Sequence, residues 1–317
     1  MKNKYFGDIN DYYKYGLLRI LSNKGEIGTA VCWMLTPDDG RGVGLIPKYL
    51  QRPDEYKHLD RDLFDALRRC WKKPDARSVR WAVRKGILPF AKTFTRRLPE
   101  EGSRRRNYFQ RFLSAARKFQ LLFFDPDTGL KWKWSRSEGK ASNAHLYLDE
   151  LQMTFDAGHS VLVYQQFPRF QRVPRKQLVR ELASRLCQLC RAPIVFSFST
   201  SRVVFLLVPQ LHLIDYFDGR CREVERNWNG WIGIAPHHAT KKGTRELATV
   251  YFNSQLLRTL KFKAIDTGES MSNLINSAVR HSLAEDAEDL AAFEERAKEP
   301  NLAFMSVLKD LRKRGKL

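Results

Sequence analysis

The stretch Leu121-Leu-Phe-Phe-Asp-Pro-Asp-Thr-Gly-Leu130 joins a short apolar run to a loop of turn-forming residues. A run of large apolar residues without alternation is typical of a strand that is buried on both faces, as in a parallel sheet. Asp, Pro and Gly are common in turns, so we expect this strand to end at Phe124. The stretch therefore predicts a central strand of an α/β domain, with acidic residues at its carboxyl end.

Other short apolar runs follow the same pattern, and charged amphipathic segments separate most of them. This alternation favours a three-layer α/β domain around a mainly parallel sheet. The last two runs are separated only by Ser199–Arg202, which allows a hairpin and hence an antiparallel edge strand. The other predicted strands are Thr29–Leu35, Ser160–Tyr164, Ile194–Phe198 and Val203–Leu207, and the helical segments are Asp62–Cys70, Arg105–Phe119 and Arg175–Leu189.

Three loops fall at the carboxyl ends of predicted strands, where ligands of open α/β sheets gather. They are Thr36–Gly42, Asp125–Leu130 and Tyr164–Pro168. An acidic residue at a strand end, followed by Pro and Gly, can bind a metal, a ribose hydroxyl or an amine. The same residue types also form ordinary turns, so the pattern alone leaves both interpretations open.

The opening segment, Tyr5-Phe-Gly-Asp-Ile-Asn-Asp-Tyr-Tyr-Lys-Tyr-Gly-Leu-Leu18, resembles the N-terminal signature of a bacterial 23S rRNA adenine-N6 methyltransferase family. That signature is a Gly-Asn-x-Ala-Asp-Val-x-Lys-His segment that leads into a helix. By position, Asp11 and Lys14 match its Asp and Lys, and Asp125-Pro126 matches the first half of the family's Asp-Pro-Pro-Tyr motif. The region is also similar to an uncharacterised bacterial family with the pattern Gly-Asp…Lys-Tyr-Gly and Asp-Pro-Asp-x-Gly-Leu.

The first resemblance implies a class I methyltransferase-like fold and S-adenosylmethionine as the cofactor. The sequence departs from the motif at Thr128, where the family has an aromatic residue that stacks on a flipped base. The Thr36–Gly42 loop also lacks the glycine spacing expected of a cofactor loop. The residues that the resemblance implies are Asp125, Asp127 and Lys14 for catalysis and Asp8, Asp11, Asp38 and Gly40 for cofactor binding.

The same acidic residues allow a rival interpretation. Four of them, Asp8, Asp11, Asp125 and Asp127, could converge on Mg²⁺, with Lys14 stabilising a phosphoryl transition state. The domain would then be a nuclease or a toxin-like domain controlled by its own C-terminal part. A third interpretation has no enzyme, only a basic scaffold in a transcriptional regulator.

The C-terminal part of the chain contains a second pattern. Side chains from Arg245 to Phe252 alternate with the period of a strand. Asn253 is a good helix N-cap, and apolar residues from Leu256 to Ile265 recur at helical spacing. Gly268 suits the end of that helix, and Ser270 can cap a second one. This order resembles the ribbon-helix-helix family of DNA-binding dimers.

The resemblance implies that residues 241–284 form a homodimer whose paired strands enter the major groove of DNA. The N-terminus of the second helix would bind a phosphate. The alternative is an ordinary strand and helical hairpin that closes the preceding domain. The DNA-binding residues that the resemblance implies are Arg245, Leu247, Thr249 and Tyr251 on the strand and Ser270 and Ser272 at the second helix.

The tail, residues 285–317, combines an acidic helical segment with an amphipathic one. It resembles the tail of ribbon-helix-helix antitoxins, which folds on a partner toxin or on a neighbouring domain. A solvated helical tail that packs on its own protein is the alternative. We therefore expect an antitoxin-like or repressor-like protein with a possible toxin partner.

The chain has 317 residues and a formal net charge of +21, which indicates a polyanionic partner: DNA, with RNA as a further candidate. The densest basic segment, Arg68–Arg111, interleaves cations with aromatic residues, a pattern that suits phosphate contacts with base stacking. No apolar run is long enough for a membrane span, and the five cysteines do not suggest a disulfide framework. We expect a cytoplasmic protein with a basic α/β domain over residues 1–240.

Overall fold

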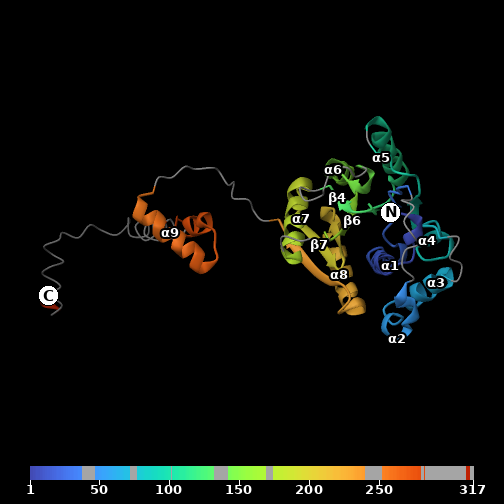
Figure 1. The fold of residues 1–317 in the computed structure, drawn as a ribbon, viewed down its shortest axis with the longest axis horizontal. Helices are drawn as coiled ribbons and strands as arrows, with labels where there is room; N and C mark the ends of the chain where they lie inside the picture. The colour runs from blue at the N-terminus through green and yellow to red at the C-terminus, as the bar shows by residue number, and fades with distance from the viewer. Residues whose placement is uncertain are drawn as a thin grey trace. The chain divides into compact units, whose positions relative to one another are not determined.

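A computed structural model of the chain describes residues 1–37, 47–71, 77–100, 102–131, 142–168, 174–239, 252–279, 282 and 312–314. The chain divides into two compact units, Met1–Lys241 and Lys242–Leu317 (Figure 1). None of the described helices is both long enough and apolar enough to cross a membrane.

The N-terminal unit is built on a seven-stranded sheet with the order β2-β1-β3-β6-β8-β7-β9. Neighbours among β2, β1, β3 and β6 are parallel, whereas β8 is antiparallel to both β6 and β7, and β9 is antiparallel to β7. The mixed α/β class and the mostly parallel sheet are confirmed. The strands are β1 (Thr29–Cys32), β2 (Ala91–Phe94), β3 (Leu121–Phe124), β6 (Ser160–Gln166), β7 (Ile194–Ser199), β8 (Val203–Val208) and β9 (Gly233–His238), with a separate parallel pair β4 (Gly129–Leu130) and β5 (His145–Leu146).

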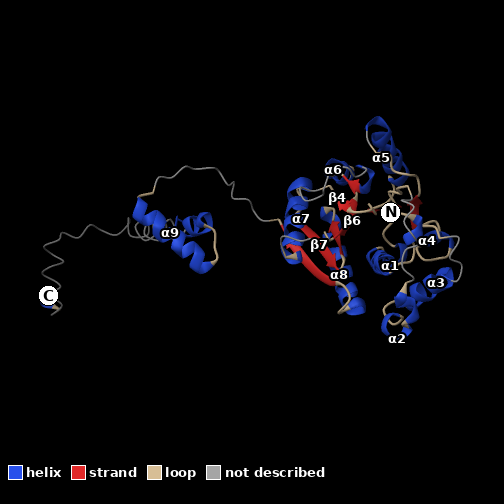
Figure 2. Cartoon of the chain, viewed as in Figure 1, coloured by secondary structure: helices blue, strands red, loops and turns tan. Residues whose placement is uncertain are grey.

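Helices cover both faces of this sheet (Figure 2). Successive strand residues point to opposite faces, so Phe123 belongs to one buried cluster and Phe124 to the other. The first cluster contains α1 (Ile9–Leu21), α3 (Arg61–Trp71), α4 (Trp81–Arg84) and α8 (Ile214–Trp228), and the second contains α5 (Gly102–Ala116), α6 (Leu148–Asp156) and α7 (Arg175–Cys190). The shorter helices are α2 (Pro53–Tyr56), η1 (Asn3–Tyr5), η2 (Asn23–Gly25), η3 (Lys48–Gln51), η5 (Ser142–Ala144) and η6 (Leu211–Leu213).

Helix α1 is fixed at its start and in its middle. The Asp8 side chain accepts a hydrogen bond from the Asp11 backbone N–H, which caps the helix. A Cβ atom at Gly16 would lie 2.2 Å from the ring of Trp228 on α8. A glycine at this position therefore lets the two helices approach closely, and it sets where α1 lies along the sheet.

Three details of the sheet differ from the sequence-based expectation. The antiparallel strand of the β7–β8 hairpin lies inside the sheet, because β8 inserts between β6 and β7. One edge of the sheet is β9, in a segment for which the sequence predicts no strand. Pro236 has no backbone N–H and is tolerated there because edge strands pair on one side only. The first strand ends at Cys32 rather than Leu35, since Met34 has a positive φ of 46°.

The C-terminal unit contains the predicted helix, glycine turn and second helix. Helix α9 spans Ser254–Thr267, the Asn253 side chain accepts from the Leu256 backbone N–H at 2.8 Å, and Gly268 ends the helix with φ 66°. Residues 271–279 are helical, and Ser270 Oγ accepts from the Asn273 N–H at 3.2 Å. Both predicted caps and the glycine turn are confirmed.

The predicted DNA-contacting strand lies outside the described residues, and a ribbon-helix-helix arrangement is not shown. Four of its expected base-contacting residues, Arg245, Leu247, Thr249 and Tyr251, fall there, while Phe252 is described and is not in a strand. The two serines expected at the second helix, Ser270 and Ser272, are described and exposed.

Candidate functional site

Strand β1 has β2 on one side and β3 on the other, so the order in which strands are added to the sheet reverses between β1 and β3. Ligands of open α/β sheets bind outside the carboxyl ends of the strands at such a switch point. Strand β1 is followed by Trp33 and strand β3 by Asp125, whose backbone N–H donates to the Cys32 carbonyl at 3.0 Å. The Asp125 loop therefore lies at the expected position for a ligand.

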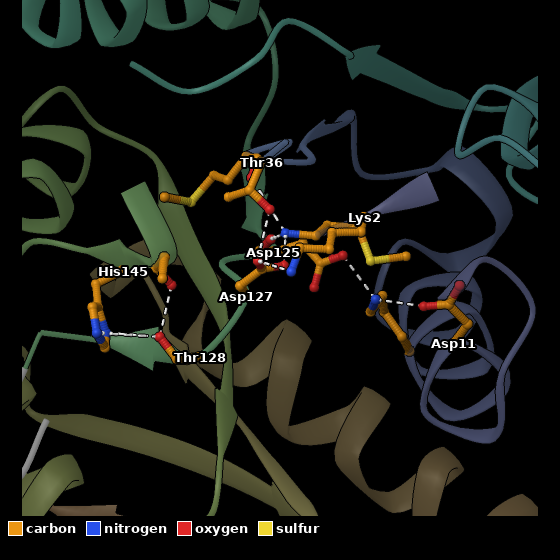
Figure 3. Close-up of polar contacts among 11 residues, drawn as sticks. Lys2, Asp11, Thr36, Asp125, Asp127, Thr128 and His145 are labelled. Atoms are coloured by element: carbon orange, nitrogen blue, oxygen red, sulfur yellow. Dashed lines mark hydrogen bonds and ion pairs between the residues drawn. The ribbon is translucent and has the colours of Figure 1, made fainter. Parts of the chain in front are cut away.

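Lys14 of helix α1 reaches this edge and binds two carboxylates (Figure 3). Its Nζ lies 2.6 Å from Oδ1 of Asp11 and 2.8 Å from Oδ2 of Asp125. All three residues are buried, with exposed fractions of 1–2%. Lys14 and Asp125 are 111 residues apart in the sequence. The two segments that resemble the methyltransferase family thus meet at the switch point.

The surroundings of Lys14 hold it rigidly. Its ammonium lies 5.8 Å from the ring centre of Trp33 and 5.4 Å from that of Tyr164. Asp11 Oδ2 accepts from the Gly7 backbone N–H at 2.9 Å and from the Tyr15 hydroxyl at 3.1 Å. The indole Nε1 of Trp33 is buried and has no hydrogen-bond partner in the described part of the chain. A buried donor of this kind can hydrogen-bond a ligand atom.

Burial and charge act against each other in this cluster. Burial alone would lower the pKa of Lys14, but Asp11 and Asp125 outweigh it and raise that pKa. Burial raises the pKa of Asp125 despite the opposing effect of Lys14. Burial and the Asp11 carboxylate raise the pKa of Asp8 to about 7. The lysine therefore stays cationic, and Asp8 titrates near neutral pH.

Asp127 has different partners from Asp125. Its carboxylate accepts from the Thr36 hydroxyl at 2.6 Å, lies 2.7 Å from the Met1 α-ammonium and lies 3.8 Å from Lys2 Nζ (Figure 3). Burial would raise the pKa of Asp127, but these cations and hydrogen bonds outweigh it, and the pKa is lowered. The carboxylate is therefore ionised and bound by ammonium groups.

The rest of the Asp125 loop is held by His145, which the sequence patterns did not single out, and by Gln165 of the Tyr164–Pro168 segment. The Thr128 hydroxyl lies 2.8 Å from Nδ1 of His145 and donates to the Ala144 carbonyl (Figure 3). Gln165 Oε1 accepts from the Leu130 N–H at 2.8 Å, and a Cβ atom at Gly129 would lie 2.3 Å from it. A glycine is needed here, since its φ is also +122°.

The structure thus brings together Asp11, Lys14 and Asp125, with Asp127 beside them in separate contacts. Asp8 caps α1, and its carboxylate has no bond to Lys14 among the described residues. Asp38 and Gly40 lie outside the described residues. No group of three or more His, Cys, Asp or Glu side chains in the described part of the chain could hold a metal ion.

Comparisons with known proteins give two findings. Residues 240–302 match a family model described as RH3 domain, which is less than half of the chain. The chain also resembles the crystal structure of a protein from Legionella pneumophila str. Philadelphia 1, described under family-model DUF519. That likeness has a TM-score of 0.38 at 10% sequence identity and covers 74% of this chain and 99% of the other, too weak a likeness for any inference about fold or function. A comparison with the curated proteins gave no match.

Proposed function

We propose that the N-terminal unit is a nucleic-acid-acting domain of methyltransferase-like architecture that binds S-adenosylmethionine at the switch point. The observation that supports this is the contact between Lys14 and Asp125 at 2.8 Å. It joins the two segments that resemble the methyltransferase family, at the sheet edge where open α/β sheets bind ligands.

The residues present suit this cofactor in two respects. S-adenosylmethionine carries an amino-acid ammonium, and Asp127 is an ionised carboxylate already paired with the Met1 α-ammonium at 2.7 Å, which the cofactor's ammonium would replace in this proposal. The buried, unpartnered Nε1 of Trp33 among the described residues can donate to a cofactor oxygen or nitrogen. When bound, the cofactor supplies an electrophilic methyl group to the reaction.

In this proposal, Asp125 orients the substrate amine. Lys14 contacts only its Oδ2, and Oδ1 has no hydrogen bond to a described residue. A free carboxylate oxygen at the carboxyl end of β3 can accept an N–H of an exocyclic amine, and Lys14 keeps the other oxygen in place. Thr128 has no aromatic ring, and its hydroxyl is hydrogen-bonded to His145, so it is not a stacking residue in this proposal.

The test is calorimetric titration of the full chain with S-adenosylmethionine. We expect saturable binding that Asp127→Asn removes, because the amide has no negative charge for the ammonium. Asp215→Asn, at an exposed aspartate on α8, is the matched control and should bind as the unaltered protein does. No binding to the unaltered protein would contradict the proposal.

The magnesium-dependent nuclease remains the alternative for the same residues. Its expected ligands Asp11 and Asp125 are both bound to the Lys14 ammonium, which stands where a cation would be. Titration with Mg²⁺ alone separates the two proposals. Saturable Mg²⁺ binding without S-adenosylmethionine binding would favour the nuclease and call for a cleavage assay.

For the C-terminal unit, we propose a DNA-binding homodimer with a repressor-like or antitoxin-like role. The supporting observation is that helix α9 has no buried residue, while Phe262 and Ile265 are 73% and 79% exposed. Apolar side chains in that number on a short helical pair favour association, because the pair cannot bury a core alone. A toxin partner for the tail is a further proposal of the same kind.

Sedimentation of the full chain tests the dimer. We expect a dimer at micromolar concentration that Phe262→Ser with Ile265→Ser converts to a monomer. Lys263→Ser, between them on the same helix, should leave the dimer intact. The affinity for operator-like DNA should fall in the monomeric variant, since two paired strands are needed to fill the major groove. A monomeric unaltered chain would contradict this proposal.

A further inference from the structure

Four arginines line a pocket of about 440 Å³ on the N-terminal unit. Arg96 and Arg97 follow strand β2, and Arg104 and Arg111 lie on helix α5. We call this the arginine pocket. Strands β2 and β1 are parallel, so the pocket lies at the same carboxyl edge of the sheet as Trp33 and the switch point.

The backbone that carries Arg96 and Arg97 is fixed. Arg97 forms a parallel bridge with Leu35, and the Leu98 N–H donates to the Leu35 carbonyl at 2.8 Å. The hydroxyl of Tyr108 lies 3.4 Å from the Arg96 carbonyl, which ties this segment to α5. The pocket is therefore built from two elements with little freedom to move apart.

Helix α5 is anchored by a different arginine. Arg105 is buried, forms an ion pair with Glu150 and donates to the His145 carbonyl at 2.7 Å. This fixes the rotation of the helix, so that its neighbours Arg104 and Arg106 are exposed. The arginines on either side of Arg105 are thus directed away from the core by one internal ion pair.

The pocket arginines have no ion-pair partner among the described residues. Glu100 is the described acidic residue in the segment from Arg96 to Arg111, and it lies outside the pocket lining. Four like charges in one concavity repel each other unless an anion is present. Planar guanidinium groups are suited to phosphate, which they can bind through two hydrogen bonds at once.

The aromatic residues next to the arginine pocket, Phe94, Tyr108 and Phe109, are not available for base stacking. Tyr108 and Phe109 are buried, and Phe94 packs against Tyr108 and Phe112. Base stacking is therefore not expected of these residues; on α5, helical periodicity turns Tyr108 and Phe109 inward and Arg104 and Arg111 outward. Without exposed rings, contacts at this surface go to phosphates rather than bases.

We infer that the arginine pocket binds consecutive phosphates of a nucleic-acid strand and holds that strand along the carboxyl edge of the sheet, toward Asp125. The inference rests on the proposed function only for what happens at Asp125. Binding at the pocket is independent of base sequence and depends strongly on salt, because it releases counterions from the strand.

The test uses the full chain and a short fluorescein-labelled single strand of mixed sequence, read by fluorescence anisotropy over a series of salt concentrations. We expect Arg104→Gln with Arg111→Gln to weaken binding roughly tenfold at moderate salt, and to lower the slope of log K against log salt by about 1.4, or about 0.7 per lost contact. Arg180→Gln with Arg185→Gln, which removes the same charge from exposed positions on α7, should change affinity less than twofold by the same rule.

Equal losses in both double variants would overturn the inference, because total charge rather than the pocket would then set the affinity. An unchanged affinity in the pocket variant would overturn it as well. Circular dichroism of each variant confirms that the fold is retained. Titration with S-adenosylmethionine on the same samples keeps the two proposals apart, since pocket variants should still bind the cofactor, and Asp127→Asn should still bind the strand.

Discussion

Two charged regions share the carboxyl edge of the sheet and use their charge in opposite ways. At the switch point, Lys14 is 2% exposed and its charge is satisfied by Asp11 and Asp125. In the arginine pocket, the guanidinium groups are exposed and have no ion-pair partner among the described residues. Burial thus decides whether a cation forms ion pairs within the protein or remains available to an external anion.

The largest effect is expected at the buried side of this comparison. Lys14→Met leaves two buried carboxylates facing each other without a cation, which should lower the free energy of unfolding by about 3–5 kcal/mol. Urea denaturation of the full chain measures this in the first unit. Lys14→Met combined with Asp125→Asn should recover part of the loss, since one of the uncompensated charges is gone. A loss as small as that of a surface substitution would mean that Lys14 is hydrated.

The sharpest form of the comparison lies on one helix. Arg105→Gln removes the buried partner of Glu150 and should cost about 3 kcal/mol of stability. Arg104→Gln, one residue earlier and exposed, should change stability by less than about 0.5 kcal/mol. In the strand-binding assay the order should reverse. Arg104→Gln should weaken binding more than Arg105→Gln does, provided that Arg105→Gln retains its fold. Similar stabilities would show that helix α5 is not anchored through Arg105.

The elements that the sequence predicted are those with a strong local pattern. The apolar run Leu121–Phe124 is strand β3 at the predicted boundaries. The edge strands β2 and β9 carry no such pattern, since Ala91–Phe94 and Gly233–His238 are partly exposed and contain polar residues. Their strand conformation comes from pairing with a neighbour that is distant in the sequence, and local patterns do not contain that information.

Three residues of the candidate site could be named from the sequence, but their contacts could not. The family resemblance named Asp11, Lys14 and Asp125, whereas nothing in their spacing indicates that Lys14 would lie between the two carboxylates. Trp33 and His145 were missed, because a single indole or imidazole has no motif around it. On α5, Arg105 looks like its neighbours in the sequence, and only the direction of its side chain distinguishes it.

A smaller effect on stability is expected from Asp8. This acid is half-buried and lies beside the buried cluster around Lys14. Its pKa is raised from 3.8 to about 7, mainly by burial and then by Asp11, so the folded protein holds a proton that the unfolded chain releases. Because the folded state then binds more protons between these two pH values, this residue lowers stability as the pH rises from 3.8 to about 7.

Asp8→Asn removes this titration and keeps the helix cap, since asparagine is an equally good N-cap. We expect the variant to gain on the order of 1–2 kcal/mol over the unaltered protein at pH 8, and to gain nothing at pH 4, where both side chains are uncharged in the folded state. Urea denaturation at the two pH values measures the difference. Asp215→Asn controls for the loss of one carboxylate at an exposed position. A gain that is the same at both pH values would show that Asp8 is ionised throughout, and that the cluster around Lys14 is open to solvent on that side.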